Sequence, residues 1–240
     1  TPPSAAQATA SREEVLAAAR GVVLFVDTFN GYFESANAHA AVKVLQAAGY
    51  TVHVATQLKD DGQHLCCGRT YLATGMVERA REKASEVVQS LLPFAERGLA
   101  IVGLEPSCLL TLRDELLVMG LGEGAQKIGQ QALLFEEFLA REAQAGQLDE
   151  LKAQITPVDR PVLLHGHCHQ KAFDAVSPVM EVLRWIPGAK PQLIESSCCG
   201  MAGSFGYEAS HYKVSMQMAE LSLLPAVRAQ PDAIVVADGT

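Results

Sequence analysis

Four of the six cysteines in this chain stand in two Cys-Cys-Gly triplets, at positions 66–68 and 198–200. Adjacent cysteines are poorly placed to bond to each other, because the eight-membered ring strains the peptide and departs from normal disulfide geometry. Two neighbouring thiolates on a loop can instead bind a metal ion or a metal–sulfur cluster. The glycine after each pair would let the backbone turn tightly and come close to a bound group.

The other two cysteines, Cys108 and Cys168, each stand shortly after an apolar run that is typical of a buried parallel strand. Four thiolates at one edge of a sheet suit an iron–sulfur cluster or a structural zinc ion. His165, His167 and His169 stand close to Cys168 in the sequence, and we interpret them as metal ligands or as hydrogen-bond donors to cluster sulfur. The plainer alternative is that these imidazoles cap the following helix.

The elements that carry these residues alternate between buried apolar runs and helical patterns. The predicted strands are 22–26, 50–55, 100–104, 162–164, 192–194 and 233–237. The predicted helices are 11–20, 35–48, 75–97 with a bend or break at Pro93, 109–119, 125–143, one that ends near 185, and 209–224. This alternation predicts an α/β fold with parallel strands, whose ligand site lies at the carboxyl ends of the strands.

The order of elements occurs twice along the chain. Each half reads strand, helix, strand, Cys-Cys-Gly, helix, strand; Cys66 and Cys198 stand 132 positions apart, and Ile101 and Ile234 stand 133 apart. We therefore predict two pseudo-symmetric Rossmann-like halves, with the Cys-Cys-Gly loops at the carboxyl ends of parallel strands. The predicted divisions are a linker and short helix (1–20), a first half (21–120), a helical bridge (121–158) and a second half (159–240) that is truncated at its C-terminus.

The two copies are not equivalent. Thr28 stands where the second half has Cys168, and Glu105 matches Asp238. With the offset of 133 between the halves, the position that matches Cys108 is 241, one residue past the end of the sequence. We therefore predict the working centre in the second half and leave metal binding by the first half open. The candidate ligands are Cys168, Cys198 and Cys199 in the second half and Cys66, Cys67 and Cys108 in the first, with Thr28, Glu105, His167 and His169 as neighbouring groups or further ligands.

The bulk properties exclude several classes of function. A net charge of −8 argues against nucleic acid or an anionic membrane surface as the main ligand. No apolar run approaches the roughly 20 residues that span a bilayer, and no signal peptide is recognised. Six cysteines with two vicinal pairs fit a reducing compartment, so we expect a cytoplasmic protein, with peripheral association at the inner membrane face left open. No nucleophile–base pair stands out, so we predict no catalytic residue.

Two segments, HCHQKA at 167–172 and SCCGMAGSFG at 197–206, make the chain resemble the cysteine-rich CCG domain family. This family occurs in the cysteine-rich subunit of heterodisulfide reductase, in the iron–sulfur subunit of glycolate oxidase and at the C-terminus of FAD-linked D-2-hydroxyacid (D-lactate type) dehydrogenases. The two segments look most like the last branch. The resemblance covers nearly the whole chain from Val22 onward.

The resemblance implies an iron–sulfur electron-transfer domain within an FAD-linked oxidoreductase. Electrons would pass from a flavin that oxidises a 2-hydroxyacid, such as D-lactate, glycolate or D-2-hydroxyglutarate, through a cysteine-bound [4Fe–4S] cluster to an acceptor. The cluster is non-cubane in some relatives, and zinc replaces it at one motif in others. The FAD, and a ferredoxin-type domain, would belong to a further part of the protein or to a partner subunit.

Departures from the family pattern leave two other functions open. Thr28 replaces the first family cysteine, and Glu105 stands where some members have the first cysteine of Cys-x-x-Cys. One alternative is a zinc-stabilised or metal-free module that docks a redox partner. The other is a disulfide reductase-type site that uses a cluster or the vicinal cysteine pair directly.

Overall fold

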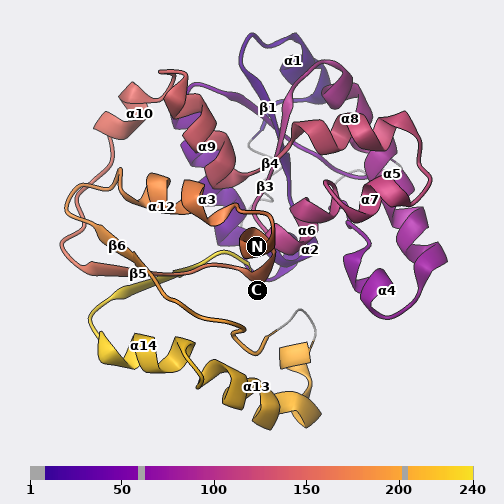
Figure 1. The fold of residues 1–240 in the computed structure, drawn as a ribbon. Coiled ribbons are helices and arrows are strands. Elements are labelled where there is room, and N and C mark those ends of the chain that lie inside the picture. The colour runs from indigo at the N-terminus through magenta and orange to yellow at the C-terminus, as the bar shows by residue number, and fades with distance from the viewer. Residues whose placement is uncertain (1–8, 59–62, 202–204, 240) are drawn as a thin grey trace. The chain divides into compact units, whose positions relative to one another are not determined.

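The computed structural model describes residues 9–58, 63–201 and 205–239. The chain divides into two compact units, Thr1–Phe138 and Leu139–Thr240, and each contains a parallel sheet with helices (Figure 1). Most of the predicted N-terminal linker (1–8) and part of the second cysteine-rich motif (202–204) lie outside the described residues. The four divisions predicted from the sequence stay a prediction.

The first unit is built on a four-stranded parallel sheet in the order β2-β1-β3-β4. Its strands are β1 (Gly21–Phe25), β2 (Thr51–Val54), β3 (Ala100–Gly103) and β4 (Ala132–Leu134). Every residue of β3 is buried, as are four of the five residues of β1. These short apolar runs therefore form central strands that are covered on both faces, as the sequence predicted.

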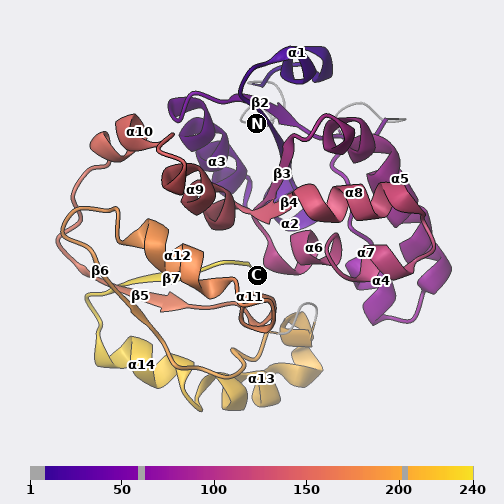
Figure 2. The same ribbon diagram turned by 45° about the horizontal axis from the view of Figure 1, so that its top comes forward.

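Helices cover both faces of this sheet. They are α1 (Arg12–Ala17), α2 (Thr28–Tyr32), α3 (Ser35–Ala47), α4 (Arg69–Ala73), α5 (Val77–Glu96), α6 (Pro106–Thr111), α7 (Glu115–Val118), α8 (Glu123–Gln131) and the start of α9 (Phe135–Gln144). Helix α3 lies on one face, and α5 and α8 lie side by side on the other (Figure 2). Helix α1 begins with a capping box, in which the Ser11 hydroxyl accepts from the Glu14 amide and the Glu14 carboxylate accepts from the Ser11 amide.

Some elements of the first unit differ from those predicted. The helix predicted over 109–119 is divided into α6, which ends at Thr111, and α7. Residues 132–134 form β4, which pairs in parallel with β3, and are not part of a continuous helix over 125–143. Their apolar pattern also fits a buried helix, and a strand of three residues is too short for alternation to show. Helix α5 continues through Pro93 to Glu96 without a break, with its last turns held by buried Leu91 and Phe94. A bend at Pro93 stays a prediction.

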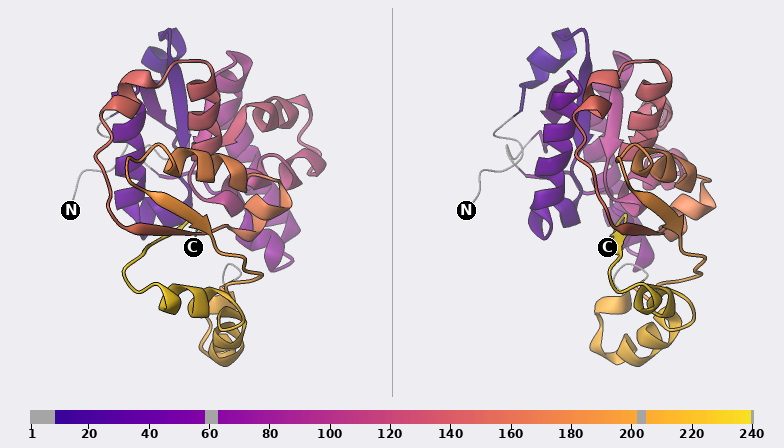
Figure 3. Two further views of the ribbon diagram at one scale, coloured as in Figure 1. Left: turned by 60° about the vertical axis from the view of Figure 1, so that its left-hand side comes forward. Right: turned by 90° about the vertical axis from the view of Figure 1, so that its left-hand side faces the viewer.

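The second unit is built on a three-stranded parallel sheet in the order β6-β5-β7. Its strands are β5 (Pro161–His165), β6 (Lys190–Leu193) and β7 (Ile234–Ala237), and its helices are α10 (Asp149–Ala153), α11 (Cys168–Ala172), α12 (Val176–Leu183), α13 (Tyr212–Ala219) and α14 (Leu223–Ala229). Helix α12 lies on one face of the sheet, and α13 and α14 lie on the other (Figure 3). The helix predicted over 209–224 is instead a short 3₁₀ turn (Ala209–His211), α13, and the start of the separate helix α14.

The two units repeat one layout. In the first, β1 leads into α2, α3 and β2; in the second, β5 leads into α11, α12 and β6. The strand registers also match, since Phe25 stands opposite Gly103 and His165 stands opposite Ala237. The predicted α/β architecture of two Rossmann-like halves is thus confirmed. In the part of the chain that the structure describes, no helix is both long and apolar enough to cross a lipid bilayer.

Candidate functional site

The second unit brings three thiols together where strands β5 and β6 end. Cys168 is the first residue of α11, directly after β5, while Cys198 and Cys199 lie on the loop after β6. Partial burial, and then the nearby charges of Cys198 and Cys199, raise the pKa of the Cys168 thiol. The three residues predicted to form the working centre therefore lie within electrostatic range of one another.

His165, the last residue of β5, is the group that contacts this thiol set most directly. It is buried, and its hydrogen bond to Cys199 is the main cause that lowers the pKa of the Cys199 thiol. The ring Nδ1 lies 2.8 Å from the hydroxyl of Ser196. If Ser196 donates to Nδ1, the Nε2–H is left to donate to the Cys199 sulfur. The sequence suggested His165, like His167 and His169, as a ligand or hydrogen-bond donor, but did not distinguish it from the other two; its one distinguishing signal was its place at the strand end.

His167 and His169 have a structural task instead. The Nδ1 of His167 accepts from the amide of His169 at 3.1 Å, and the amide of His167 donates to the side chain of Gln170 at 3.0 Å. These bonds cap the start of α11, and the two imidazole rings stack with centroids 5.2 Å apart. The structure thus supports the capping alternative for His167 alone, and a ligand role for either histidine stays a prediction.

The glycines of both triplets make the tight turns that were predicted. Gly200 has φ +91°, and its amide donates to the Cys198 sulfur at 3.3 Å. A Cβ on Gly200 would lie 2.2 Å from the carbonyl oxygen of Ser215 in α13. Gly68 is its counterpart, with φ +84° and a Cβ position 2.8 Å from the carbonyl oxygen of Ala80 in α5. The close approach that requires glycine is therefore to a neighbouring helix.

The first unit arranges its cysteines differently. The sulfurs of Cys67 and Cys108 are 3.2 Å apart and share a hydrogen bond, and both residues are buried. Cys66 is hydrogen-bonded to the hydroxyl of Thr28, and burial raises the pKa of its thiol. Thr28 begins α2 as Cys168 begins α11, so the structure places it where the sequence comparison predicted.

Two buried carboxylates face the thiols of the first unit. Asp27 accepts from the amides of Phe29 and Asn30, and Glu105 accepts from the amide and hydroxyl of Ser107. Asp27 and Glu105 are each 1% exposed, and the negative charge of both contributes to raising the pKa of Cys108. The main cause that raises the pKa of Cys108 is its hydrogen bond to Cys67. When Cys67 ionises, the Cys108 S–H donates to its thiolate, so the same bond lowers the pKa of Cys67.

These surroundings decide which thiol set fits a cluster. Among the described residues, no three His, Cys, Asp or Glu side chains are arranged to hold a single metal ion. A four-iron cluster differs because each thiolate binds a different iron, so its ligands need not converge on one point. The second unit fits such a group, with three thiols at one sheet edge and N–H donors on two of the sulfurs.

The first unit fits a cluster poorly. The Thr28 hydroxyl stands in place of one thiol, and the thiols of Cys67 and Cys108 are hydrogen-bonded to each other. The buried charges nearby, those of Asp27 and Glu105, are negative. An anionic cluster held by thiolates would add negative charge beside Asp27 and Glu105. The ligand role predicted for Cys66, Cys67 and Cys108 stays a prediction.

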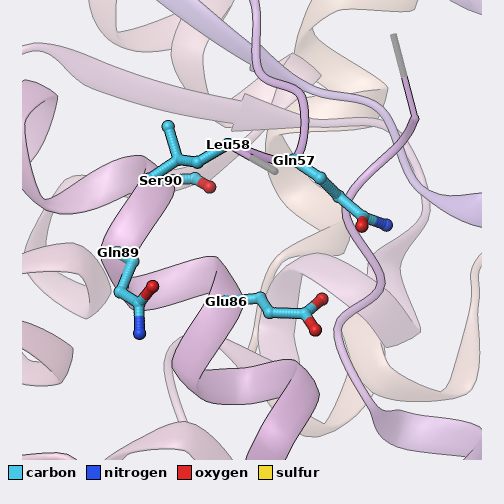
Figure 4. Close-up of a pocket in the computed structure, with 5 residues that line it drawn as sticks. All are labelled: Gln57, Leu58, Glu86, Gln89 and Ser90. Atoms are coloured by element: carbon cyan, nitrogen blue, oxygen red, sulfur yellow. The ribbon is translucent and has the colours of Figure 1, made fainter. Parts of the chain in front are cut away.

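A small pocket in the first unit is separate from the cysteines. The residues that line it come from the segment after β2 and from α5 (Figure 4): Gln57, Leu58, Glu86, Gln89 and Ser90. Its one carboxylate, Glu86, is paired with Lys83 at 2.9 Å. The pocket therefore offers no convergent set of reactive groups.

Comparison with known proteins places this layout in a family. The chain is 28% identical over 195 residues to a subunit of the anaerobic glycerol-3-phosphate dehydrogenase of Escherichia coli (strain K12), a match that covers 81% of this chain and 46% of that protein. It is 27% identical over 223 residues to D-2-hydroxyglutarate dehydrogenase of Pantoea ananatis, covering 92% of this chain and 20% of the relative. The chain thus spans about half the length, or less, of these relatives.

The match to a protein family covers both units. The profile of the CCG Cysteine-rich domain matches residues 28–113, which hold the first set of cysteines, and residues 162–240, which hold the second. Both matched segments contain a Cys-Cys-Gly triplet and the strand-end residue that was compared between the halves, Thr28 or Cys168. The predicted resemblance is confirmed: the chain belongs to the CCG cysteine-rich domain family.

Proposed function

We propose that this chain is the electron-transfer domain of a flavin-linked dehydrogenase and that its second unit binds a [4Fe–4S] cluster. The observation that carries the proposal is the set of three thiols at the ends of β5 and β6, two of which accept hydrogen bonds from N–H groups. The family match and the dehydrogenase relatives support the same conclusion. The isolated chain would be part of an oxidoreductase.

Each residue of the second unit has a defined part in this proposal. Cys168, Cys198 and Cys199 are the ligands, and such a cluster, when bound, supplies one-electron transfer at a potential set by charge and hydrogen bonding. His165 and the amide of Gly200 donate to the sulfurs of Cys199 and Cys198 and so stabilise their thiolate forms. A fourth ligand would come from outside the described residues.

Lys171 supports the same loop from α11. Its ammonium donates to the carbonyl oxygen of Ser196 at 2.6 Å, and Ser196 is the residue that contacts His165. The positive charge of Lys171 also acts to lower the pKa of Cys168. This arrangement would hold the imidazole in one orientation and offset negative charge at the thiols.

The substrate and the electron donor are also part of the proposal. We propose a 2-hydroxyacid, in line with the names of the D-2-hydroxyglutarate dehydrogenases; the other relative is named for glycerol 3-phosphate, which is also a secondary alcohol. FAD, and any ferredoxin-type clusters, would lie in the rest of the protein or in a partner subunit. Electrons would pass from the reduced flavin through the second unit to an acceptor.

The test is metal analysis with spectroscopy on the full-length protein, purified without oxygen. We expect broad visible absorbance that bleaches when the substrate reduces the flavin. Cys198→Ser should remove about four irons per chain relative to the wild type and abolish transfer to the acceptor. The matched variant Cys66→Ser should keep both.

A protein with no iron attributable to residues 1–240, or with zinc bound by the second unit, would overturn the proposal. That result would favour the docking-module alternative, in which Cys198→Ser lowers stability but leaves electron transfer intact.

A further inference from the structure

We propose that Cys67 and Cys108 of the first unit form a redox-active dithiol, which a low-molecular-weight aliphatic disulfide oxidises to an intramolecular disulfide. The observation that carries this inference is the 3.2 Å separation of their sulfurs within one buried hydrogen bond. The inference goes beyond the proposed function and does not depend on a cluster in the second unit.

The geometry selects this pair among the thiols of the first unit. A disulfide bond is about 2.05 Å long, so the two sulfurs need to approach by only about 1 Å. Cys67 lies just before α4 and Cys108 lies in α6, two helices that contact each other. Cys66 is engaged by the Thr28 hydroxyl, and a Cys66–Cys67 bond would close the strained vicinal ring.

The buried charges favour a neutral product. The carboxylates of Asp27 and Glu105 are each 1% exposed and lie near this pair of sulfurs. Thiolates held permanently by a cluster would keep negative charge beside these carboxylates, whereas a disulfide carries no charge. Oxidation of the pair therefore leaves Cys66 as the one ionisable sulfur of the first unit.

The reaction is a two-step thiol–disulfide exchange. The Cys67 thiolate attacks one sulfur of the external disulfide, breaks its S–S bond and releases one small thiolate. The Cys108 thiolate then attacks the Cys67 sulfur of the mixed disulfide, forms the Cys67–Cys108 bond and releases the second small thiolate. The protein pair gives up two electrons and two protons, and the external disulfide becomes two thiols.

Because Cys67 and Cys108 are buried, their exchange with an external disulfide should be slow and the disulfide that they form should be shielded from external reagents. Cys67 is 5% exposed and Cys108 is 7% exposed, so an external reagent reaches them less readily than it reaches the exposed Cys168. The disulfide would close a loop that spans 67–108 and link α6 to the segment before α4. Oxidation should therefore raise the midpoint temperature of the first unit, by about 5 °C or more.

The test is equilibration of the reduced full-length protein, without oxygen, in a series of oxidised-to-reduced glutathione ratios. Acid quenching, alkylation and peptide mapping by mass spectrometry then report each cysteine. We expect a Cys67–Cys108 linked peptide whose fraction follows a two-electron curve. Cys108→Ser should abolish this linked peptide, while the matched control Cys66→Ser should keep it.

Three results would overturn the inference. They are the absence of the linked peptide at every ratio, a link that joins other cysteines in its place, and one zinc per chain that is lost in Cys108→Ser. Circular dichroism of Cys108→Ser and of Cys108→Ala separates loss of the pair from loss of the fold. Iron measured in the same samples reports the second unit independently, so failure of the proposed function and failure of this inference are distinguishable.

Discussion

The two units carry the same Cys-Cys-Gly loop at the same edge of a parallel sheet, yet the groups around the sulfurs differ in charge. In the second unit His165 and the Gly200 amide donate to two of the thiols. In the first unit the carboxylates of Asp27 and Glu105 face the thiols, and Cys67 has Cys108 as its partner. The imidazole of His165 lowers the pKa of Cys199 in the second unit. In the first unit the two carboxylates act to raise the pKa of Cys108, while the bond from Cys108 lowers the pKa of Cys67.

Differences at the strand ends account for much of this contrast. The last residue of β1 is Phe25, whose side chain has no hydrogen-bond donor, whereas the last residue of β5 is His165, whose imidazole has one. Asp27 caps α2 with a carboxylate, whereas His167 caps α11 with an imidazole. A duplicated scaffold can thus keep its backbone geometry while a few side chains change the chemistry of its cysteines.

The second unit also has a partly buried acid, Asp238, at the position matched to Glu105. Gln170 donates to its carboxylate at 2.6 Å, and burial raises its pKa, which favours the neutral acid.

The largest expected effect compares the two triplet glycines. Gly200→Ala should lower the free energy of unfolding of the second unit by about 3 kcal/mol or more, because the new Cβ overlaps the Ser215 carbonyl and φ stays positive. Gly68→Ala should cost the first unit about 2 kcal/mol, since its nearest contact is longer. The control Gly75→Ala, whose Cβ meets nothing within 4 Å, should cost about 1 kcal/mol.

Urea unfolding followed by fluorescence separates the units. Trp185 is the single tryptophan of the chain and lies in the second unit, so Gly200→Ala should shift its transition and Gly68→Ala should not. Equal shifts for the two variants would contradict the difference in packing.

A smaller effect tests the strand that distinguishes the first sheet. The Glu137 carboxylate accepts from the Leu134 amide of β4 and from Arg113, at 2.9 and 2.8 Å. Glu137→Ala should therefore cost the first unit about 1 to 2 kcal/mol, measured by circular dichroism in urea. Lys127→Ala, which removes the exposed ion pair with Glu96, should cost less than about 0.5 kcal/mol. A Glu137 effect as small as the Lys127 effect would show that this contact does not hold β4.

The third prediction concerns a variant in which His165, the last residue of β5, is replaced by phenylalanine, the residue that ends β1. His165→Phe removes the N–H that stabilises the Cys199 thiolate, so the pKa of Cys199 should rise. In metal-free protein at pH 7, alkylation of Cys199 by iodoacetamide should slow about tenfold, the factor that corresponds to one charge-assisted hydrogen bond. His167→Asn, which keeps a capping side chain on α11, is the matched control. An unchanged rate of Cys199 alkylation in His165→Phe would contradict the role assigned to this imidazole.

The duplicated architecture was predictable from the sequence because apolar runs, glycines and cysteines recur in the same order in both halves. Strand β4 was missed because three apolar residues fit a helix as well as a strand. Helix α14 was missed because Pro225 looks like a stop signal, although proline is tolerated in the first turn of a helix.

The site was predictable in its cysteines but not in their partners. Spacing placed Cys168, Cys198 and Cys199 at one sheet edge, because the carboxyl ends of parallel strands share an edge. Spacing did not show which of the nearby histidines turns toward a sulfur, or that Cys67 pairs with Cys108. Both depend on side-chain packing between segments that are distant in the sequence.

The most direct test of the central claim is the iron content of two matched variants of the full-length protein, purified without oxygen. Cys67 and Cys199 occupy equivalent places in the two triplets, 132 positions apart. We predict that Cys199→Ser loses about four irons per chain relative to the wild type and that Cys67→Ser loses none. Equal loss from both variants, or loss from Cys67→Ser alone, would contradict the assignment of the cluster to the second unit.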